Sequence, residues 1–140
     1  MLKNIPVCIS PDLMHAMLSM GHGDEIIISD SDFPATTYSQ RLIRADGLEV
    51  ATLLDAILQF YPLDTFVENP VATMDASDWS KEEPPSYQKF RDIIKRHDKN
   101  FTEFEYVKRF DFYERAGKAY TVIATSTPEG NLILKKGCVE

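Results

Sequence analysis

The amino-acid sequence predicts an α/β fold: a single three-layer domain spanning residues 1–140, with a mostly parallel sheet and helices on both of its faces. Two patterns indicate this fold. Short apolar runs of strand length alternate with amphipathic segments of helical spacing, and several of these runs are apolar at consecutive positions, as in strands buried on both faces. A chain of 140 residues without internal repeats or a flexible linker suits one core.

Helices are predicted over residues 11–20, 50–61 and 85–97. The first begins with Ser10-Pro11-Asp12, which supplies an N-cap, a proline at the first helical position and an early acid, and it ends at Gly21. The second follows the i, i+3, i+4, i+7 spacing of apolar residues most closely. The third opens at a proline-serine pair and carries basic residues on its exposed face.

Strands are predicted from short apolar runs between and after these helices. They cover Glu25–Ser29, Pro70–Met74, Phe104–Lys108, Ala119–Thr125 and Asn131–Lys135. The last two are close in sequence, so they are either two buried strands or a hairpin-like pair. The polar stretch from Met74 to Ser86, around the lone Trp79, is interpreted as a surface excursion.

Composition argues against several classes of protein. Fifteen basic and 22 acidic residues give a formal net charge of −7, and the Lys and Arg residues are scattered, so nucleic acid is not expected as a partner. No apolar run approaches the roughly 18 residues that span a bilayer, and the first residues lack the apolar stretch of a secretory signal. We therefore expect a cytoplasmic protein with no membrane partner.

The sequence also contains no motif that would bind a metal or a cofactor. Cys8 and Cys138 stand at opposite ends outside any CxxC or Cys/His spacing, so free thiols are expected. The three histidines have no metal-ligand spacing. Glycine-rich phosphate loops and the serine-hydrolase elbow are absent as well. The expectation is a protein with no metal and no cofactor.

Two loops beside the first predicted strand are candidates for chemistry. His22 stands between two glycines, where its imidazole can reach a cleft and exchange a proton near neutral pH; the alternative is an exposed histidine after a helix C-cap. Asp30 follows the strand at its carboxyl end, where α/β proteins place ligand-binding loops. A carboxylate there suits a hydroxyl-rich ligand, and the alternative is an ordinary Asx turn.

Two later segments have the composition of a sugar site. Arg109–Ala116 mixes aromatic rings, which cover C–H patches, with charged groups such as Arg109 that fix hydroxyls. The alternative for this segment is an amphipathic turn with Phe110 and Phe112 in the core and with Glu114 and Arg115 in water. Gly130-Asn131, just before the last strand, combines a tight turn with an amide that both donates and accepts.

The ordered set of these segments resembles the ribose pyranase and fucose mutarotase family, above all its L-fucose mutarotase branch. The resemblance is collinear from Leu2 to Gly137 and rests on Met20-Gly21-His22-Gly23-Asp24-Glu25-Ile26, Phe33-Pro34-Ala35 with Ile43-Arg44-Ala45-Asp46-Gly47, Arg109-Phe110-Asp111-Phe112-Tyr113-Glu114-Arg115-Ala116 and Gly130-Asn131-Leu132-Ile133-Leu134-Lys135-Lys136-Gly137. It implies a ribose pyranase-like fold and a cofactor-free isomerase of sugar utilisation, which interconverts the α and β anomers of a free monosaccharide such as L-fucose.

The resemblance also implies roles for particular residues. His22 corresponds to the proton donor of the family. Substrate-binding residues are implied at Asp30, Arg109, Tyr113, Glu129, Gly130, Asn131 and Asp64. Family members usually have Tyr-Gly-Asn in the last turn, whereas this chain has Glu129-Gly130-Asn131. The tyrosine is missing, which bears on the choice of sugar.

Self-association is expected on two grounds. At about 3.3 Å per residue, an extended path from His22 to Asp30 exceeds about 20 Å, so either the glycine loop folds back or a neighbouring copy contributes. Members of the family form rings and pairs of rings, which implies a ring-type homo-oligomer, a decamer being one such form. The alternatives are a D-ribose pyranase, a non-catalytic monosaccharide-binding protein of an uptake system and an oligomeric structural protein.

Overall fold

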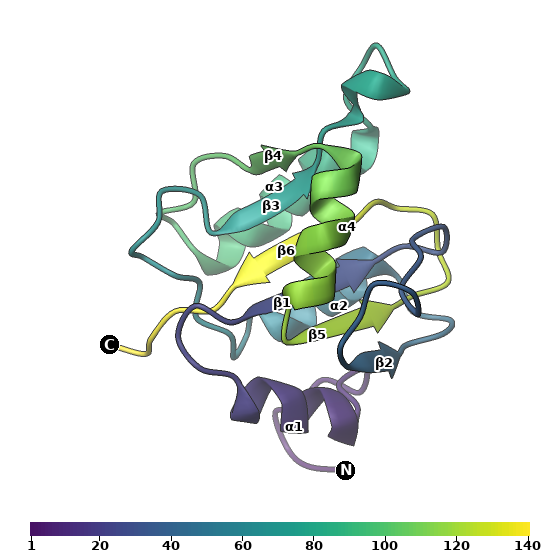
Figure 1. Cartoon of the computed structure of the whole chain (residues 1–140). Helices are drawn as coiled ribbons and strands as arrows, with labels where there is room; N and C mark the ends of the chain where they lie inside the picture. The colour runs from purple at the N-terminus through teal and green to yellow at the C-terminus, as the bar shows by residue number, and fades with distance from the viewer.

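A six-stranded sheet in the order β2-β5-β1-β6-β3-β4 forms the middle layer of the computed structural model, which describes residues 1–140 (Figure 1). The strands are β1 (Glu25–Ser29), β2 (Leu42–Arg44), β3 (Val71–Met74), β4 (Glu105–Val107), β5 (Thr121–Ala124) and β6 (Leu132–Lys135). Only β6 runs antiparallel to its neighbours, β1 and β3; the other pairs are parallel. The predicted mostly parallel sheet is confirmed.

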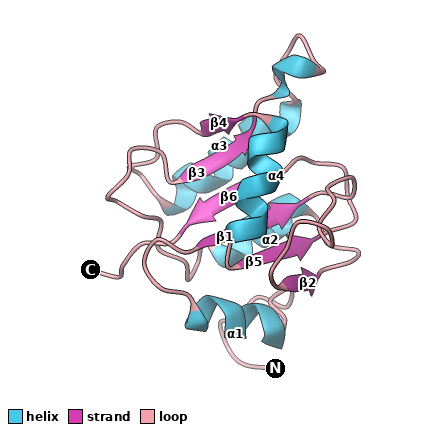
Figure 2. Cartoon of the chain, in the orientation of Figure 1, coloured by secondary structure: helices cyan, strands magenta, loops and turns pink.

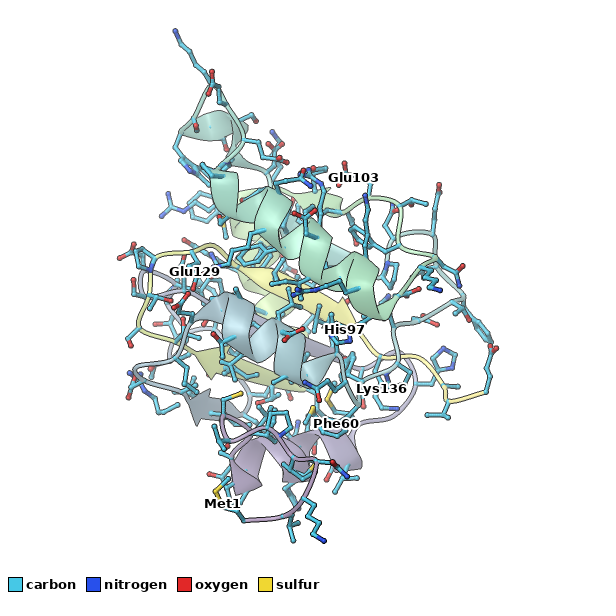
Figure 3. The ribbon with its side chains drawn as sticks, turned by 180° about the vertical axis from the view of Figure 1, so that it is seen from behind. Met1, Phe60, His97, Glu103, Glu129 and Lys136 are labelled. Carbon is cyan, nitrogen blue, oxygen red and sulfur yellow. The ribbon has the colours of Figure 1, made fainter.

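Helices cover both faces of this sheet, as predicted (Figure 2). They are α1 (Pro11–Ser19), α2 (Val50–Ile57), α3 (Pro85–His97) and α4 (Arg109–Lys118), with a short 3₁₀ helix, η1 (Ala76–Asp78). Helix α4 lies alone on one face, α2 and α3 lie side by side on the other (Figure 3), and α1 lies beside the β2 end of the sheet. The predicted N-cap of α1 is confirmed, because the Ser10 hydroxyl accepts from the Leu13 amide at 3.1 Å.

Two hydrophobic cores separate these layers, and strand β1 contributes to both. Ile26 and Ile28 pack in the larger core, beneath α1, α2 and α3, whereas Ile27 packs in the smaller core beneath α4. Alternate side chains of a strand point to opposite faces. A strand that is covered on both faces therefore needs apolar residues at consecutive positions, which explains the Ile-Ile-Ile run.

The hairpin-like pairing of the last two strands is wrong. Strand β1 lies between them, pairing with β5 on one side and with β6 on the other. Neighbouring strands are about 4.8 Å apart, so the chain has to cover only about 10 Å to pass one intervening strand. The segment from Thr125 to Asn131 is long enough for that crossing.

Two elements were not expected, and one is shorter than expected. Arg109–Ala116 belongs to helix α4 rather than to an amphipathic turn; only Phe112 and Ala116 of this helix are buried, so its apolar stripe is too thin to show a period. Strand β2 is a three-residue edge strand. Helix α2 ends at Ile57, and the chain then turns through residues 58–60 to the buried Tyr61.

Candidate functional site

The parallel strands end at one edge of the sheet, and most of the predicted binding residues meet there. Asp30 follows β1, Asn131 directly precedes the antiparallel β6, and Arg109 opens α4 after β4. Between them is a cavity of about 310 Å³, lined by Asp30, Asp32, Phe33, Met74, Trp79, Arg109, Tyr113 and Asn131. That volume is at the small end of the range of about 300–1,000 Å³ that is typical of ligand sites.

Asn131 connects the end of β1 to β3 through two hydrogen bonds. Its side-chain oxygen accepts from the Asp30 amide at 2.8 Å, and its backbone oxygen accepts from the Thr73 hydroxyl at 2.9 Å. The side-chain nitrogen of Asn131, Nδ2, makes no hydrogen bond within the chain and is therefore free to donate to a ligand. The preceding Gly130 has φ +113°, and a Cβ there would lie 3.4 Å from the Tyr87 ring. A glycine is required to place Asn131.

The Asp30 carboxylate is the acidic group of the cavity. Burial raises the pKa of Asp30, and so does the nearby charge of Asp32. The Asp32 backbone amide lowers this pKa, because it donates to Asp30 Oδ1 at 3.1 Å. In its ionised form, the Asp30 carboxylate is an acceptor that can bind two hydroxyl groups of a sugar.

Arg109 and Tyr113 form the helical wall of the cavity. The Arg109 Nε donates to the Tyr113 hydroxyl at 2.9 Å, one turn along α4. The Tyr113 ring stacks on Tyr38 with centroids 5.1 Å apart, and the edge-to-face contact with Phe33 has a centroid distance of 5.3 Å. These contacts fix the wall, while the terminal guanidinium nitrogens of Arg109 have no acceptor in the chain.

His22 lies at the opposite edge of the sheet, paired with Asp64. Its Nε2 is 2.9 Å from Asp64 Oδ1, and the Phe66 amide donates to the same oxygen at 3.1 Å. Burial tends to raise the pKa of Asp64, but the Phe66 amide and His22 together with Lys135 outweigh it and lower the pKa. This carboxylate is therefore ionised and orients the imidazole.

The glycine loop does not fold back over the sheet. The Gly23 amide donates to the backbone oxygen of Lys136 at 2.8 Å, which fixes the loop beside the end of β6. Strand β1 separates His22 from Asp30, and its five residues span about 16 Å. His22 and Asp64 are thus brought together with each other, but not with Asp30 and Asn131.

Glu129 is directed away from the cavity. Its Oε1 accepts from the Val50 amide at 3.0 Å and from the Thr127 hydroxyl at 3.0 Å, and Lys89 is 3.8 Å from its other oxygen. Figure 3 shows it beside α2. Because the N-cap residue of α2, Glu49, makes no side-chain capping bond, Glu129 serves the start of that helix instead.

The apolar part of the cavity wall was not predicted from the sequence. Trp79, Phe33 and Met74 line it together with the second aspartate, Asp32. The only signal for Trp79 was its isolation in a polar stretch that follows a strand end. No group of three or more His, Cys, Asp or Glu side chains is placed to hold a metal ion. None of the helices is long and apolar enough to cross a membrane.

A carboxylate, an amide, a guanidinium and aromatic rings around a small cavity are the groups of a site for a small polyhydroxylated ligand, as in carbohydrate-binding proteins. Comparison with known proteins specifies the class further. The model of the RbsD / FucU transport protein family matches residues 3–139, and the chain belongs to this family. The family resemblance of the sequence is therefore confirmed.

The relatives of this chain include proteins named fucose mutarotase. It is 43% identical to the fucose mutarotase of Mus musculus, over 99% of this chain and 95% of that protein. It is 42% identical to the L-fucose mutarotase of Actinobacillus pleuropneumoniae serotype 5b, over 98% and 96%. The fucose mutarotase of Streptococcus pneumoniae, solved in complex with L-fucose, has a TM-score of 0.92 at 40% identity and covers 99% of this chain and 100% of its own.

The ribose branch shares the fold. RbsD of Bacillus subtilis, solved in complex with D-ribose, has a TM-score of 0.72 at 20% identity, with full coverage of both chains. The ribose pyranase-like fold expected from the sequence is confirmed by this likeness. At that identity it says nothing about which sugar this chain binds.

Proposed function

We propose that this chain is a mutarotase that interconverts the α and β anomers of L-fucose, acting in the cytoplasm in sugar utilisation. The observation that carries the proposal is the cavity at the carboxyl edge, which brings together Asp30, Asn131, Arg109 and Tyr113. Relatives at 40–43% identity are fucose mutarotases, one of them solved with L-fucose bound. The polar groups of the cavity offer both acceptors and donors, as a sugar ring requires.

Anomer exchange needs two proton transfers. The ring oxygen gains a proton while the anomeric hydroxyl loses one, and the resulting open-chain aldehyde closes again on its other face. The ionised Asp30 accepts hydroxyl hydrogens, and the free amide hydrogens of Asn131 donate, so these groups would hold the sugar. No covalent intermediate is needed for this reaction.

We assign the general acid to His22. The Asp64 carboxylate accepts from Nε2, so the neutral imidazole carries its proton on that nitrogen and Nδ1 is an acceptor; in the imidazolium, Nδ1 donates. One ring can therefore give a proton and take it back. Positioned acid–base groups of this kind contribute roughly 10²–10⁴-fold to a rate.

The distance between His22 and the cavity supports a site shared between two copies of the chain. His22 lies at the amino edge of the sheet and the cavity at the carboxyl edge, so the His22 loop of one copy would close the cavity of the next. Such a head-to-tail contact joins two different surfaces, and it generates a ring when the rotation closes. This geometry favours a ring-type homo-oligomer, with a decamer as one form.

Saturation-transfer NMR tests the activity, because it measures anomer and ring exchange at equilibrium without a coupled assay. We expect the protein to accelerate exchange between the anomers of L-fucose, and His22→Ala to lower that rate by about 10²–10⁴-fold. Exchange confined to the ring forms of D-ribose would make the chain a pyranase. If neither L-fucose, D-ribose nor D-galactose exchanged faster, a sugar-binding protein would be the better description.

Mixing two inactive variants tests the shared site. His22→Ala keeps Asp30, and Asp30→Ala keeps His22. If they are unfolded together at equal amounts and refolded, random assembly pairs an intact His22 with an intact Asp30 at about a quarter of the contacts in a ring. We therefore expect about a quarter of the native exchange rate. A mixture as inactive as its two components would place both residues of each site in one chain.

A further inference from the structure

Trp79 is the one large aromatic ring of the cavity wall that has no partner in the chain. It is 54% exposed, it stacks on no other ring, and its indole N–H has no acceptor. We infer that Trp79 packs against the C–H face of the bound sugar and sets the preference for a 6-deoxyhexose. This inference rests on the proposed function and adds the residue that selects the substrate.

The other aromatic rings of the cavity wall already make contacts within the chain. Tyr113 stacks on Tyr38 and makes edge-to-face contacts with two phenylalanine rings, and its hydroxyl is bonded to Arg109. Phe33 is only 8% exposed and packs in the core beneath α4. Both rings thus already pack against other aromatic rings of the chain, whereas the indole of Trp79 does not.

The turn before β6 offers no ring that could take this role. Its Glu129 carboxylate bonds to the start of α2, and its Gly130 has no side chain. The turn that carries Asn131 therefore borders the cavity without an aromatic ring of its own, and Phe33, in the turn after Asp30, is almost fully buried. Trp79, from the segment after β3, supplies that surface.

The segment that carries Trp79 is anchored at its start. The Asp75 amide donates to Val107 at 2.8 Å, its carboxylate accepts from the Ser77 amide at 3.0 Å, and Lys108 lies 3.1 Å from that carboxylate. The first of these bonds continues the alignment of β3 with β4. Trp79 itself closes the short turn, because its amide donates to Ala76 at 3.1 Å.

The same segment is also anchored where it returns to the fold. Arg91 of α3 donates to Glu83 at 2.8 Å and to the Tyr106 hydroxyl at 2.7 Å. The backbone of the segment is thus held at both ends rather than forming a free loop. A ligand that packs on the indole therefore has little backbone left to order.

The chemistry of a deoxyhexose fits this arrangement. A pyranose has hydroxyls that need donors and acceptors, and C–H patches that pack on aromatic faces. A 6-deoxyhexose adds a methyl group, and the nearby wall includes the apolar side chain of Met74. L-galactose differs from L-fucose only by a hydroxyl on that carbon, which makes it the matched test sugar.

Because Trp79 is the only tryptophan of the chain, its fluorescence reports directly on its surroundings. We expect a saturable change in emission when L-fucose is added to the native protein, with the same midpoint as the concentration dependence of anomer exchange. Trp79→Ala should raise KM for L-fucose about tenfold with little change in kcat, since the ring packs on the ground state and the transition state alike. Trp79→Phe should keep most of the affinity, and Trp79→Ala should narrow the preference for L-fucose over L-galactose.

Phe60→Ala is the matched control, because Phe60 is an exposed aromatic residue that lies near the end of α2 and lines no part of the cavity (Figure 3). We expect its KM to equal that of the native protein. Two results together would overturn the inference while the proposed function stands: the native protein catalyses exchange but its emission does not change when L-fucose is added, and Trp79→Ala has the native KM. An absence of exchange in the native protein, by contrast, would refute the proposed function itself.

Discussion

The His22 imidazole is bonded through Nε2 to Asp64 Oδ1 at 2.9 Å, although 42 residues separate the two in the chain. The Asp64 side chain is only 5% exposed, whereas that of His22 is 34% exposed. A buried carboxylate therefore holds an accessible ring by one nitrogen and leaves the other free. Pairs of this kind fix both the orientation and the tautomer of the imidazole.

This pair predicts the effect of Asp64→Asn. An amide in place of the carboxylate no longer forces the proton onto Nε2, so the ring is free to adopt the wrong tautomer. We expect the rate of anomer exchange to fall at least about tenfold. The circular dichroism spectrum should match that of the native protein, because the fold is preserved. Asp92→Asn, on the exposed face of α3, is the control and should exchange at the native rate. Native activity in Asp64→Asn would remove Asp64 from the mechanism.

Asp30 predicts a conflict between stability and binding. Its raised pKa, caused first by burial and then by the charge of Asp32, means that the folded state holds the ionised form less well than the unfolded state does. The ionised group thus costs stability above the unfolded pKa of about 3.9, and this cost disappears as the pH falls through the raised pKa.

Asp30→Asn should therefore bind sugar weakly and yet melt at the same temperature as the native protein or higher at pH 7. Thermal unfolding at pH 7 and at pH 3 checks this, because the two proteins should converge at the lower pH, where Asp30 is neutral in both states. A melting temperature of the variant clearly below the native value at pH 7 would contradict the role of burial in shifting this group.

The sequence was most informative where structure is local. Ser10 caps α1 through a bond to the amide three residues later, and the consecutive isoleucines of β1 reflect its cover on both faces. Helix α4 escaped prediction because only Phe112 and Ala116 face the core. The order of β5, β1 and β6 was also not predictable, since it depends on which strands meet in three dimensions rather than on neighbours in sequence.

The same distinction applies to the site. The position of Asp30 follows from a general rule, since ligand loops lie at the carboxyl ends of parallel strands. Asn131 and Arg109 join it in the cavity because β6 and α4 begin at that edge. The function of Glu129 was hidden, because its partner Val50 is 79 residues away. Trp79 was equally hidden, since nothing in a polar stretch indicates where its ring comes to lie.

Glu129→Ala distinguishes a helix cap from a sugar ligand. The variant loses the acceptor for the Val50 amide at the start of α2, which should cost about 1 kcal/mol of unfolding free energy. Because the carboxylate points away from the cavity, we expect KM for L-fucose to stay at its native value. Urea unfolding and the concentration dependence of anomer exchange check the two halves of this prediction. A raised KM at unchanged stability would return Glu129 to the binding site.

Arg115 links α4 to two strands of the sheet. Its Nη2 lies 2.6 Å from Glu25 of β1, and its Nη1 lies 2.9 Å from Glu105 of β4. The Glu25 side chain is only 13% exposed, so a charge there depends on its partner. Removing one member of a mostly buried pair leaves the other uncompensated, which is more harmful than removing both.

We therefore expect Arg115→Ala to lose about 3 kcal/mol of unfolding free energy, as measured by urea denaturation. The double variant Arg115→Ala with Glu25→Gln should recover a large part of this loss, because it leaves no unpaired charge on β1. Such a recovery identifies the uncompensated Glu25 carboxylate as the source of the instability. If the double variant were as unstable as Arg115→Ala, the cost would instead come from the packing of the arginine side chain between α4 and the sheet.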